Sequence, residues 1–315
     1  MIKMDKKSTR DGYGRGLEEI GKDRRVVALD ADLSESTRSA WFKERYPDRF
    51  FDMGIAEADM ISTAAGLATC GKVPFASTFA VFATGRAYDQ VRVSVAYNKL
   101  NVRIVGSHAG LLTGEDGASH QSLEDISMMR ALPDMTVIQP ADFTEAKKAV
   151  AALLDHEGPA YLRLGRGKVP MLFDDNYKFK IGKGVLLKKG NDAVIFATGS
   201  MVHIAMEAAQ DLERQSIKAA VVNIHTIKPI DSKLVVDLVK ETKAAVTAED
   251  HSIIGGLGSS IAEIIAENGL SNLKRVGVKD SFGESGKPGE LYKKYGLTKE
   301  EIIKAAKYVV ERKVK

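Results

Sequence analysis

Charged side chains follow several predicted strands, at points where a ligand could be bound. Asp30 and Asp32 close the first predicted strand, and Glu57 follows the second. His108 closes a later strand, and Arg166 follows the last strand of this series. In open α/β sheets, ligands bind outside the carboxyl ends of the strands, where groups from different strands converge. We therefore predict a functional site at this edge of the sheet.

Other short motifs do not indicate nucleotide or metal chemistry. A dinucleotide-binding fold needs G-x-G-x-x-G between its first strand and helix, whereas the first predicted strand here ends in LDADLSES. Gly12, Gly14 and Gly16 come before that strand. None of the remaining histidines has the spacing of a metal motif, so we predict no metal site in this chain. These histidines are His156, His203, His225 and His251.

The elements that must position these residues are short β-branched runs alternating with longer amphipathic stretches. Such alternation predicts a parallel sheet with helices on both faces. The predicted strands of the first half are residues 25–32, 50–54, 73–79, 102–108, 136–140 and 160–165. The predicted helices between them are residues 56–69, 83–99, 123–130 and 144–155.

A stretch at residues 165–183, carrying Gly, Pro, Asp and Lys, interrupts this pattern and is typical of a linker. A second alternation follows it, with predicted strands at 193–198, 219–224, 244–248 and 275–278. Its predicted helices are residues 202–215, 231–241, 258–267 and 298–312. We predict two α/β domains, with a first domain at 1–172, a linker at 173–184 and a smaller second domain at 185–315.

The composition limits the class of protein. The chain has 315 residues and a formal net charge of +4, from 46 Lys and Arg against 42 Asp and Glu. This small excess does not indicate nucleic-acid binding, but it suits a small anionic substrate. Cys70 is the single cysteine, which excludes an intrachain disulfide, and we expect its thiol to be buried. No apolar run approaches the ~18 residues that span a membrane, and the charged amino terminus is unlike a signal peptide. We predict a cytoplasmic protein.

The residues then carry a resemblance to a known family. The segments STRDGYGRGLEEI, LDADLSEST, FFDMGIAEADM, ASTFAVFATGRAYDQVR, GSHAGLLTGEDGASHQSLED and LRLGRG resemble the pyrimidine-binding domain of transketolases, in the same order. TAEDHSIIGGLGSSIAE and VKDSFGESGKPGELYKKYGLT resemble the carboxy-terminal domain of that family. The resemblance begins near Ser8 and continues to the end of the chain. It implies a thiamine-diphosphate-dependent enzyme that transfers a two-carbon ketol unit between sugar phosphates.

The resemblance also implies roles for the cofactor-binding residues. Glu57 matches the catalytic glutamate that hydrogen-bonds the aminopyrimidine ring of thiamine diphosphate and promotes the tautomer that activates the cofactor. That role requires a buried carboxyl group able to donate its proton. The alternative is a structural glutamate in the first turn of a helix. Phe79 and Phe82 match aromatic residues that pack around the aminopyrimidine. Asp32 matches an acidic residue near the cofactor, and a structural role is equally open for it.

For the substrate, guanidinium groups bind phosphate through paired donors, and serine and imidazole add further donors. The residues that match sugar-phosphate contacts of the family are Arg10, Ser36, His108 and Arg166. Asp116 and His120 match residues that contact the sugar hydroxyls. With Glu57, the resemblance thus makes His108 and Asp116 the candidates for a direct catalytic role.

The chain also departs from the family. Its GIAEAD segment and its AYDQV segment resemble deoxyxylulose-phosphate synthase, and AYDQV also resembles the β subunits of 2-oxo acid dehydrogenases. Single-chain transketolases are about twice as long, and their first half binds the diphosphate with a GDG segment that is absent here. The resemblance therefore implies a separate N-terminal subunit that supplies the diphosphate site and a Mg or Ca ion, in a two-plus-two heterotetramer. Half of a deoxyxylulose-phosphate synthase-like enzyme and a non-catalytic sugar-phosphate-binding paralogue are the alternatives.

Overall fold

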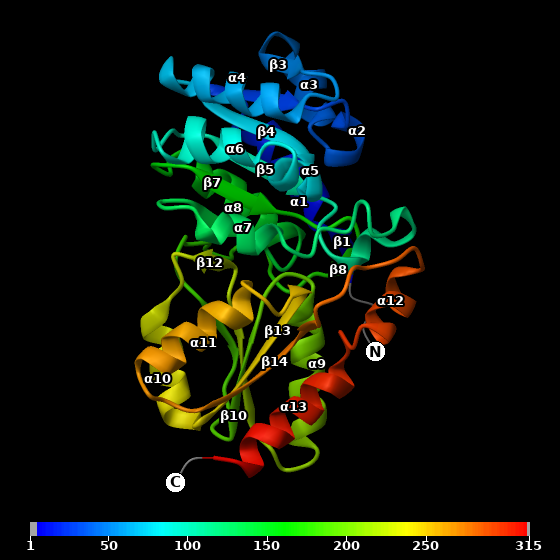
Figure 1. Cartoon of the computed structure of the whole chain (residues 1–315), viewed down its shortest axis with the longest axis vertical. Coiled ribbons are helices and arrows are strands. Elements are labelled where there is room, and N and C mark those ends of the chain that lie inside the picture. Colours follow the sequence, from blue (N-terminus) through cyan, green and yellow to red (C-terminus); the bar gives the residue numbers. More distant parts are fainter. Residues whose placement is uncertain (1–4, 314–315) are drawn as a thin grey trace.

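The computed structural model describes residues 5–313, which form two α/β domains stacked one above the other (Figure 1). The first domain is built on a seven-stranded sheet with the strand order β12-β6-β7-β5-β4-β2-β3. All neighbours in this sheet are parallel except β12, which pairs with β6 in the antiparallel sense. The strands are β2 (Val26–Asp30), β3 (Phe50–Asp52), β4 (Val73–Phe79), β5 (Arg103–Ser107), β6 (Thr136–Ile138), β7 (Ala160–Arg163) and β12 (Thr226–Lys228).

Helices cover both faces of this sheet because alternate strand residues point to opposite sides and both sides are apolar. Val26 and Ala28 pack with α1, α3 and α8, whereas Val27 and Leu29 pack with α4, α7 and a π-helical turn, η2. The helices of the domain are α1 (Thr9–Ile20), α2 (Ser34–Thr37), α3 (Ala40–Arg45), α4 (Glu57–Thr69), α5 (Ala80–Gly85), α6 (Tyr88–Gln90), α7 (Asp125–Ala131) and α8 (Phe143–Leu154), with 3-10 turns η1 (Pro47–Arg49) and η3 (Leu111–Asp116) and the π turn η2 (Val91–Ala96).

The glycines near the amino terminus allow α1 and α8 to pack closely. A Cβ atom at Gly12 would lie 2.3 Å from the carbonyl oxygen of Phe143, and one at Gly16 would lie 2.9 Å from Cβ of Val150. Only glycine therefore fits this contact without a shift of the helices. This close packing fixes the position of Arg10, because Arg10 lies in the first turn of α1.

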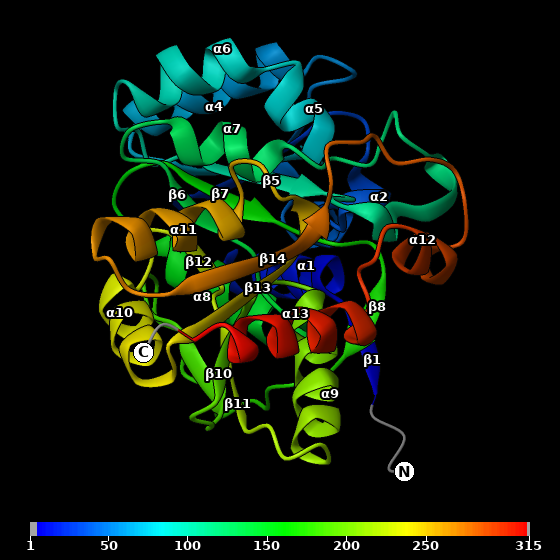
Figure 2. The ribbon, with the colours of Figure 1, turned by 60° about the horizontal axis from the view of Figure 1, so that its bottom comes forward.

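The second domain has a five-stranded sheet with the order β14-β13-β10-β11-β9, in which only the edge strand β9 is antiparallel. Helices α9 and α13 cover one face and cross each other in Figure 2, and α10 and α11 cover the other. Its strands are β9 (Val185–Lys188), β10 (Ala193–Ala197), β11 (Ala219–Asn223), β13 (Ala244–Ser252) and β14 (Asn272–Val278). Its helices are α9 (Met201–Glu213), α10 (Ser232–Thr242), α11 (Leu257–Glu267), α12 (Pro288–Lys294) and α13 (Lys299–Glu311).

The two-domain α/β fold agrees with the prediction, but several local features differ from it. The predicted helix at 83–99 is broken into α5, α6 and η2, because α5 ends at Gly85, a poor helix former. The stretch interpreted as linker contains β8 (Lys168–Pro170), which pairs with β1 (Lys6–Ser8). Cys70 is exposed rather than buried, because it follows the last residue of α4, beyond the buried turns of that helix. Among residues 5–313, no helix is long and apolar enough to cross a membrane.

Candidate functional site

Four aromatic side chains gather at the carboxyl ends of β4 and β5, and we call this group the aromatic slot. Phe79 ends β4 and Phe82 follows in α5, and their rings stack with centroids 5.9 Å apart. The imidazole of His108 stacks on the ring of Phe79, with the two centroids 4.0 Å apart. His120 meets both phenyl rings edge-on, at 5.8 and 5.4 Å. Phe82 is half-buried, so part of this aromatic group can be reached by a ligand.

Glu57 is the first residue of α4, and its side chain is buried although it carries a charge. Its Oε1 accepts a hydrogen bond of 3.0 Å from Nη1 of Arg86. The same guanidinium lies over the ring of Phe82, 3.9 Å from its centroid. Arg86 therefore connects the buried carboxylate to the aromatic slot.

His108 is held in one neutral tautomer. Nη1 of Arg10 lies 3.3 Å from its Nε2, and Ser107 Oγ lies 2.9 Å from its Nδ1. Because a guanidinium can only donate, Nε2 must accept, and Nδ1 carries the proton toward Ser107. Burial, followed by the positive charges of Arg10 and Arg166, lowers the pKa of His108 to about 3. The imidazole is therefore neutral near pH 7.

The arginines around His108 form a positively charged rim. Nη1 of Arg10 also donates to the carbonyl oxygen of Ser36, at 2.9 Å. Burial, followed by the charges of Arg38 and Arg166, lowers the pKa of Arg10, and its Nε is a buried donor without a partner. Guanidinium groups that repel one another and have unused donors suit a phosphate dianion.

Arg166 and Asp116 form an ion pair at the surface. Nη1 of Arg166 donates to the carbonyl oxygen of Thr113 at 2.8 Å, and it lies 3.3 Å from Oδ2 of Asp116. Both side chains are about one-third exposed, at 37% and 35%. This pair is therefore open to solvent and can exchange its partner for a ligand at small cost.

The loop after β2 is shaped by Asp30, which is buried. Its carboxylate accepts hydrogen bonds from the backbone of Leu33 and from the hydroxyl groups of Thr37 and Ser39. Burial raises the pKa of Asp30 to about 6. The exposed Asp32 has a left-handed backbone with φ of 61°. Asp30 is thus a residue that organises this loop.

The structure gathers most of the predicted residues around one slot. Contacts run from Arg10 through His108 and the two phenylalanines to His120 and, through Arg86, to Glu57, while Arg166 reaches Asp116. Ser36 contributes its carbonyl oxygen rather than its hydroxyl group. Two residues were missed by the sequence analysis, Arg86 and Ser107. The first has a signal in the sequence, because a cation four residues after Phe82 on a helix faces the same side.

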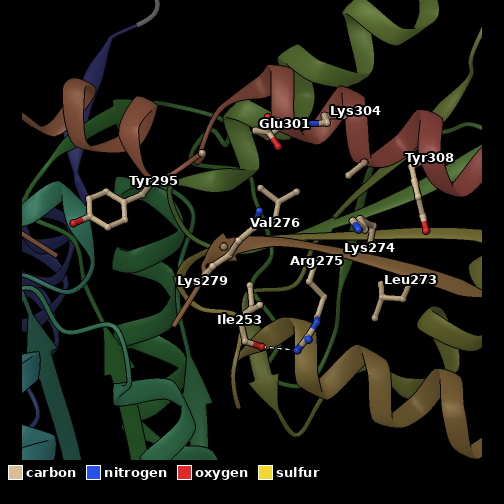
Figure 3. Close-up of a pocket in the computed structure, with 13 residues that line it drawn as sticks. Ile253, Leu273, Lys274, Arg275, Val276, Lys279, Tyr295, Glu301, Lys304 and Tyr308 are labelled. Atoms are coloured by element: carbon tan, nitrogen blue, oxygen red, sulfur yellow. Dashed lines mark hydrogen bonds and ion pairs between the residues drawn. The ribbon is translucent and has the colours of Figure 1, made fainter. Parts of the chain in front are cut away.

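These residues fit one end of thiamine diphosphate. The half-buried ring of Phe82 and the buried carboxyl group of Glu57, joined by Arg86, are of the types that match a flat aminopyrimidine with polar ring nitrogens. No group of three or more His, Cys, Asp or Glu side chains suited to a metal ion occurs within residues 5–313. A cavity of about 590 Å³ lies between β14 and α13, lined by Lys274, Arg275 and Tyr308 among others (Figure 3), and it contains none of the predicted site residues.

Comparison with known families gives two consecutive matches. The transketolase pyrimidine-binding domain matches residues 5–171, and the transketolase C-terminal domain matches residues 182–302. A Methanocaldococcus jannaschii protein described as a transketolase C-terminal section is 49% identical over 303 residues, with 95% of each chain covered. A 6-deoxy-6-sulfo-D-fructose transketolase subunit from Clostridium sp. is 46% identical and covers 99% of this chain and 97% of its own length. Mouse transketolase (Mus musculus) is 39% identical over 98% of this chain, but only 50% of its own length is matched.

Solved structures give the same picture. A split gene transketolase in an inactive β4 tetramer has a TM-score of 0.92 and 47% identity, with 98% of this chain and 99% of that chain covered. A transketolase structure from Campylobacter jejuni has a TM-score of 0.82 at 24% identity, with 96% of this chain and 47% of that chain covered, and shares the fold. Both domains therefore have counterparts, in the same order, in chains of the same length and in chains about twice as long.

Proposed function

Because the chain belongs to the transketolase family and corresponds to the C-terminal part of a split-gene transketolase, we propose that it catalyses ketol transfer together with a separate N-terminal chain. The reaction moves a two-carbon ketol unit from a ketose phosphate to an aldose phosphate. The observation that supports this most directly is the buried Glu57 beside an aromatic slot whose far rim is cationic.

The residues of this chain would have three tasks: binding the aminopyrimidine, orienting the sugar hydroxyl groups and holding the phosphate of the sugar. Glu57, Phe79 and Phe82 would hold the aminopyrimidine, with the carboxyl group on a ring nitrogen and the phenyl rings along its face. His120, Asp116 and His108 would orient the sugar hydroxyl groups, with His108 neutral. Thiamine diphosphate supplies the carbon nucleophile for the transfer.

The phosphate of the sugar would be held by the cationic rim. Arg10 and Arg166 offer guanidinium donors, and Ser36 lies beside Arg10. Asp32, on the neighbouring loop, would face the cofactor or the partner chain. Fixing the phosphate at one end limits the positions of the reacting carbonyl group, which is how such contacts raise the rate.

The N-terminal chain would bring the diphosphate site and a Mg or Ca ion, and we propose two copies of each chain in the active assembly. Support comes from the related split gene transketolase, whose β4 tetramer is described as inactive. We also propose a cytoplasmic location, which agrees with a single free cysteine.

Reconstitution tests the proposal. The chain and the N-terminal subunit would be purified separately, mixed with thiamine diphosphate and Mg²⁺, and assayed for ketol transfer from xylulose 5-phosphate to ribose 5-phosphate. We expect turnover from the mixture and none from this chain alone. Turnover by this chain alone, or pyruvate consumption in place of ketol transfer, would contradict the proposal.

The role of Glu57 can be separated from helix stabilisation. Asp59 lies in the same first turn of α4 but is exposed, so both carboxylates interact similarly with the helix dipole. We expect Glu57→Gln to lower kcat of the reconstituted complex by at least about 100-fold. Asp59→Asn should leave kcat within about twofold. Equal effects of the two changes would assign Glu57 a structural role only.

A donor panel would identify the anionic group that the rim accepts. The Clostridium sp. relative is named for a sulfonated ketose, and a sulfonate carries one negative charge where a phosphate carries up to two. With two arginines on the rim, we expect fructose 6-phosphate to be preferred over 6-deoxy-6-sulfofructose. The ratio of kcat/KM for the two donors measures this preference.

A further inference from the structure

The loop that carries Asp116 and His120 is anchored by the second domain. We call residues 110–121 the substrate loop. The backbone N–H of Leu111 donates a 2.9 Å hydrogen bond to Oδ1 of Asp250, at the end of β13. At the other end of the loop, Nε2 of Gln121 donates to the carbonyl oxygens of Gly114 and Glu284, each at 2.9 Å.

Asp250 is itself fixed on both sides. Its Oδ2 accepts a 2.8 Å hydrogen bond from the hydroxyl group of Tyr292, in α12. That hydroxyl group also lies 2.7 Å from Oγ of Ser200. Asp250 is almost fully buried, and burial raises its pKa. A buried carboxylate is costly, so a position that retains one must use both of its oxygens.

Glycines let the loop approach the second domain closely. Gly110, with φ of 78°, faces the Asp250 carboxylate, and an added Cβ would lie 2.2 Å from Oδ2. Gly117, with φ of 76°, faces Ser285 in the same way, at 2.5 Å from Oγ. Since both residues also need a left-handed backbone, the loop is built to fit this surface.

From these contacts we infer that the second domain positions the substrate loop, with Asp250 as the principal positioning residue. Asp250 would act through the backbone of Leu111 and would not touch the substrate. This inference rests on the proposed function, because the loop matters only if Asp116 and His120 bind the sugar. It gives the second domain a part in substrate binding, although its own side chains lie outside the slot.

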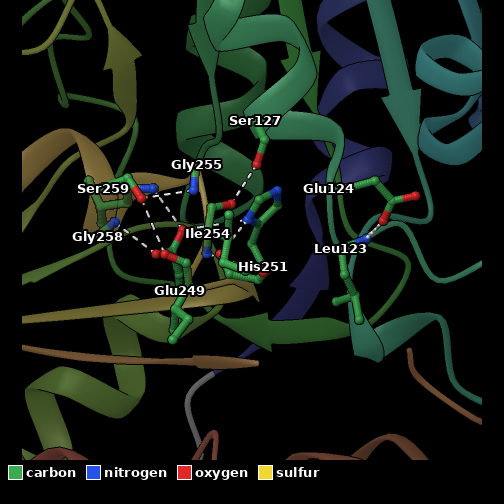
Figure 4. A network of polar contacts seen from close by, with 12 residues as sticks. Leu123, Glu124, Ser127, Glu249, His251, Ile254, Gly255, Gly258 and Ser259 are labelled. Atoms are coloured by element: carbon green, nitrogen blue, oxygen red, sulfur yellow. Dashed lines mark hydrogen bonds and ion pairs between the residues drawn. The ribbon is translucent and has the colours of Figure 1, made fainter. Parts of the chain in front are cut away.

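Substitution of Asp250 can be compared with a matched neighbour. Glu249 is equally buried on the same strand, but its oxygens accept from the backbone of Leu257 and Gly258, at the start of α11 (Figure 4). In the reconstituted complex, Asp250→Ala should raise KM for the donor sugar about tenfold and change the Kd of thiamine diphosphate less than twofold. Glu249→Ala should lower the melting temperature without raising KM.

Asp250→Asn should rescue the effect. Its oxygen can still accept from Leu111, and its amide can donate to Tyr292, whose hydroxyl group then donates to Ser200. We expect KM within about threefold of the unmodified complex. A tenfold rise in KM for Asp250→Asn, or equal rises for Asp250→Ala and Glu249→Ala, would overturn the positioning role.

Hydrogen exchange on the chain without its partner gives a second measurement that needs no activity. Amides of residues 110–121 should exchange about tenfold faster in Asp250→Ala than in Glu249→Ala. If Asp250→Ala does not fold, Gln121→Ala removes the other anchor and should give the same faster exchange. Unchanged exchange in the folded variants would overturn the inference. If the unmodified complex has no ketol-transfer activity while the variants show the expected exchange, the proposed function is refuted and the positioning of the loop is not.

Discussion

At the scale of single residues, the contact of Arg86 matters most. Its guanidinium occupies the face of Phe82 and the oxygen of Glu57 that an aminopyrimidine would need. Under the proposed function, Arg86 and the aminopyrimidine would compete for the same carboxyl oxygen and the same phenyl face.

Replacing Arg86 should make the cofactor bind more tightly. In Arg86→Gln no guanidinium has to leave the aromatic slot before the cofactor binds, so a larger fraction of the molecules is able to bind it. We expect the Kd of thiamine diphosphate for the reconstituted complex to fall about three- to tenfold, as measured by calorimetry. The exposed Arg92→Gln serves as the control for loss of a positive charge. A weaker affinity for Arg86→Gln would mean that the guanidinium belongs to the bound state.

Most candidate site residues could be grouped from the sequence because they follow strand ends, which the fold brings together whatever the details of packing. Glu57, Phe79 and His108 are of this kind. Arg86 was missed because its role depends on a side-chain contact rather than on a position in the sheet. Ser36 shows the same limit: it was predicted to contact a sugar phosphate, and the structure adds a contact of its carbonyl oxygen with Arg10 that its residue type does not indicate.

At the scale of elements, the packing of α1 on α8 sets the place of Arg10. Gly12→Ala would put a methyl group 2.3 Å from the carbonyl oxygen of Phe143, so the helices must separate. We expect a loss of about 1–3 kcal/mol in the free energy of unfolding, as for other overpacked contacts. Urea denaturation at a fixed protein concentration measures it.

Gly85→Ala is the matched control for that change. An added Cβ there meets nothing within 4 Å, so we expect a change within about 1 kcal/mol and in the stabilising direction. A Gly12→Ala variant as stable as Gly85→Ala would show that α1 can shift freely.

The alternation of strands and helices was predictable because a parallel sheet needs an apolar run for each strand and an amphipathic helix for each return. Two of the three-residue strands, β8 and β12, were not predicted. Each lies outside the alternation of strands and helices, and its pairing partner is distant in the sequence. The π turn η2 likewise has no signature that separates it from the helix before it.

At the scale of the whole molecule, the two domains share a buried polar network. Glu145 in α8 accepts hydrogen bonds from Tyr177 in the connecting segment, at 2.7 Å, and from Asn223 at the end of β11, at 2.9 and 3.0 Å. Burial raises the pKa of Glu145 to about 7. The unfolded chain ionises this group near its ordinary pKa of 4.5. This group therefore lowers the free energy of unfolding progressively as the pH rises from about 4.5 to about 7.

Comparison with Glu145→Gln should reveal this dependence. The variant cannot ionise, so its stability relative to the unmodified chain should improve as the pH rises through this window. The improvement should be on the order of 1–3 kcal/mol. Urea denaturation between pH 5 and 8 measures it, with Glu241→Gln as the control at an exposed site. A difference in stability that does not vary with pH would contradict the raised pKa.

The last strand of the first sheet comes from the second domain, and this bears on how the chain is made. Until Thr226 and Lys228 have left the ribosome, β6 has an open edge that can pair with other nascent chains. Lys228 then closes the junction by donating from its Nζ to the carbonyl oxygen of Arg130, at 3.0 Å. If translation ended between the two domains, before residue 185, the edge of β6 would stay unpaired. The first domain expressed alone should therefore aggregate, whereas the full chain should remain soluble under the same conditions.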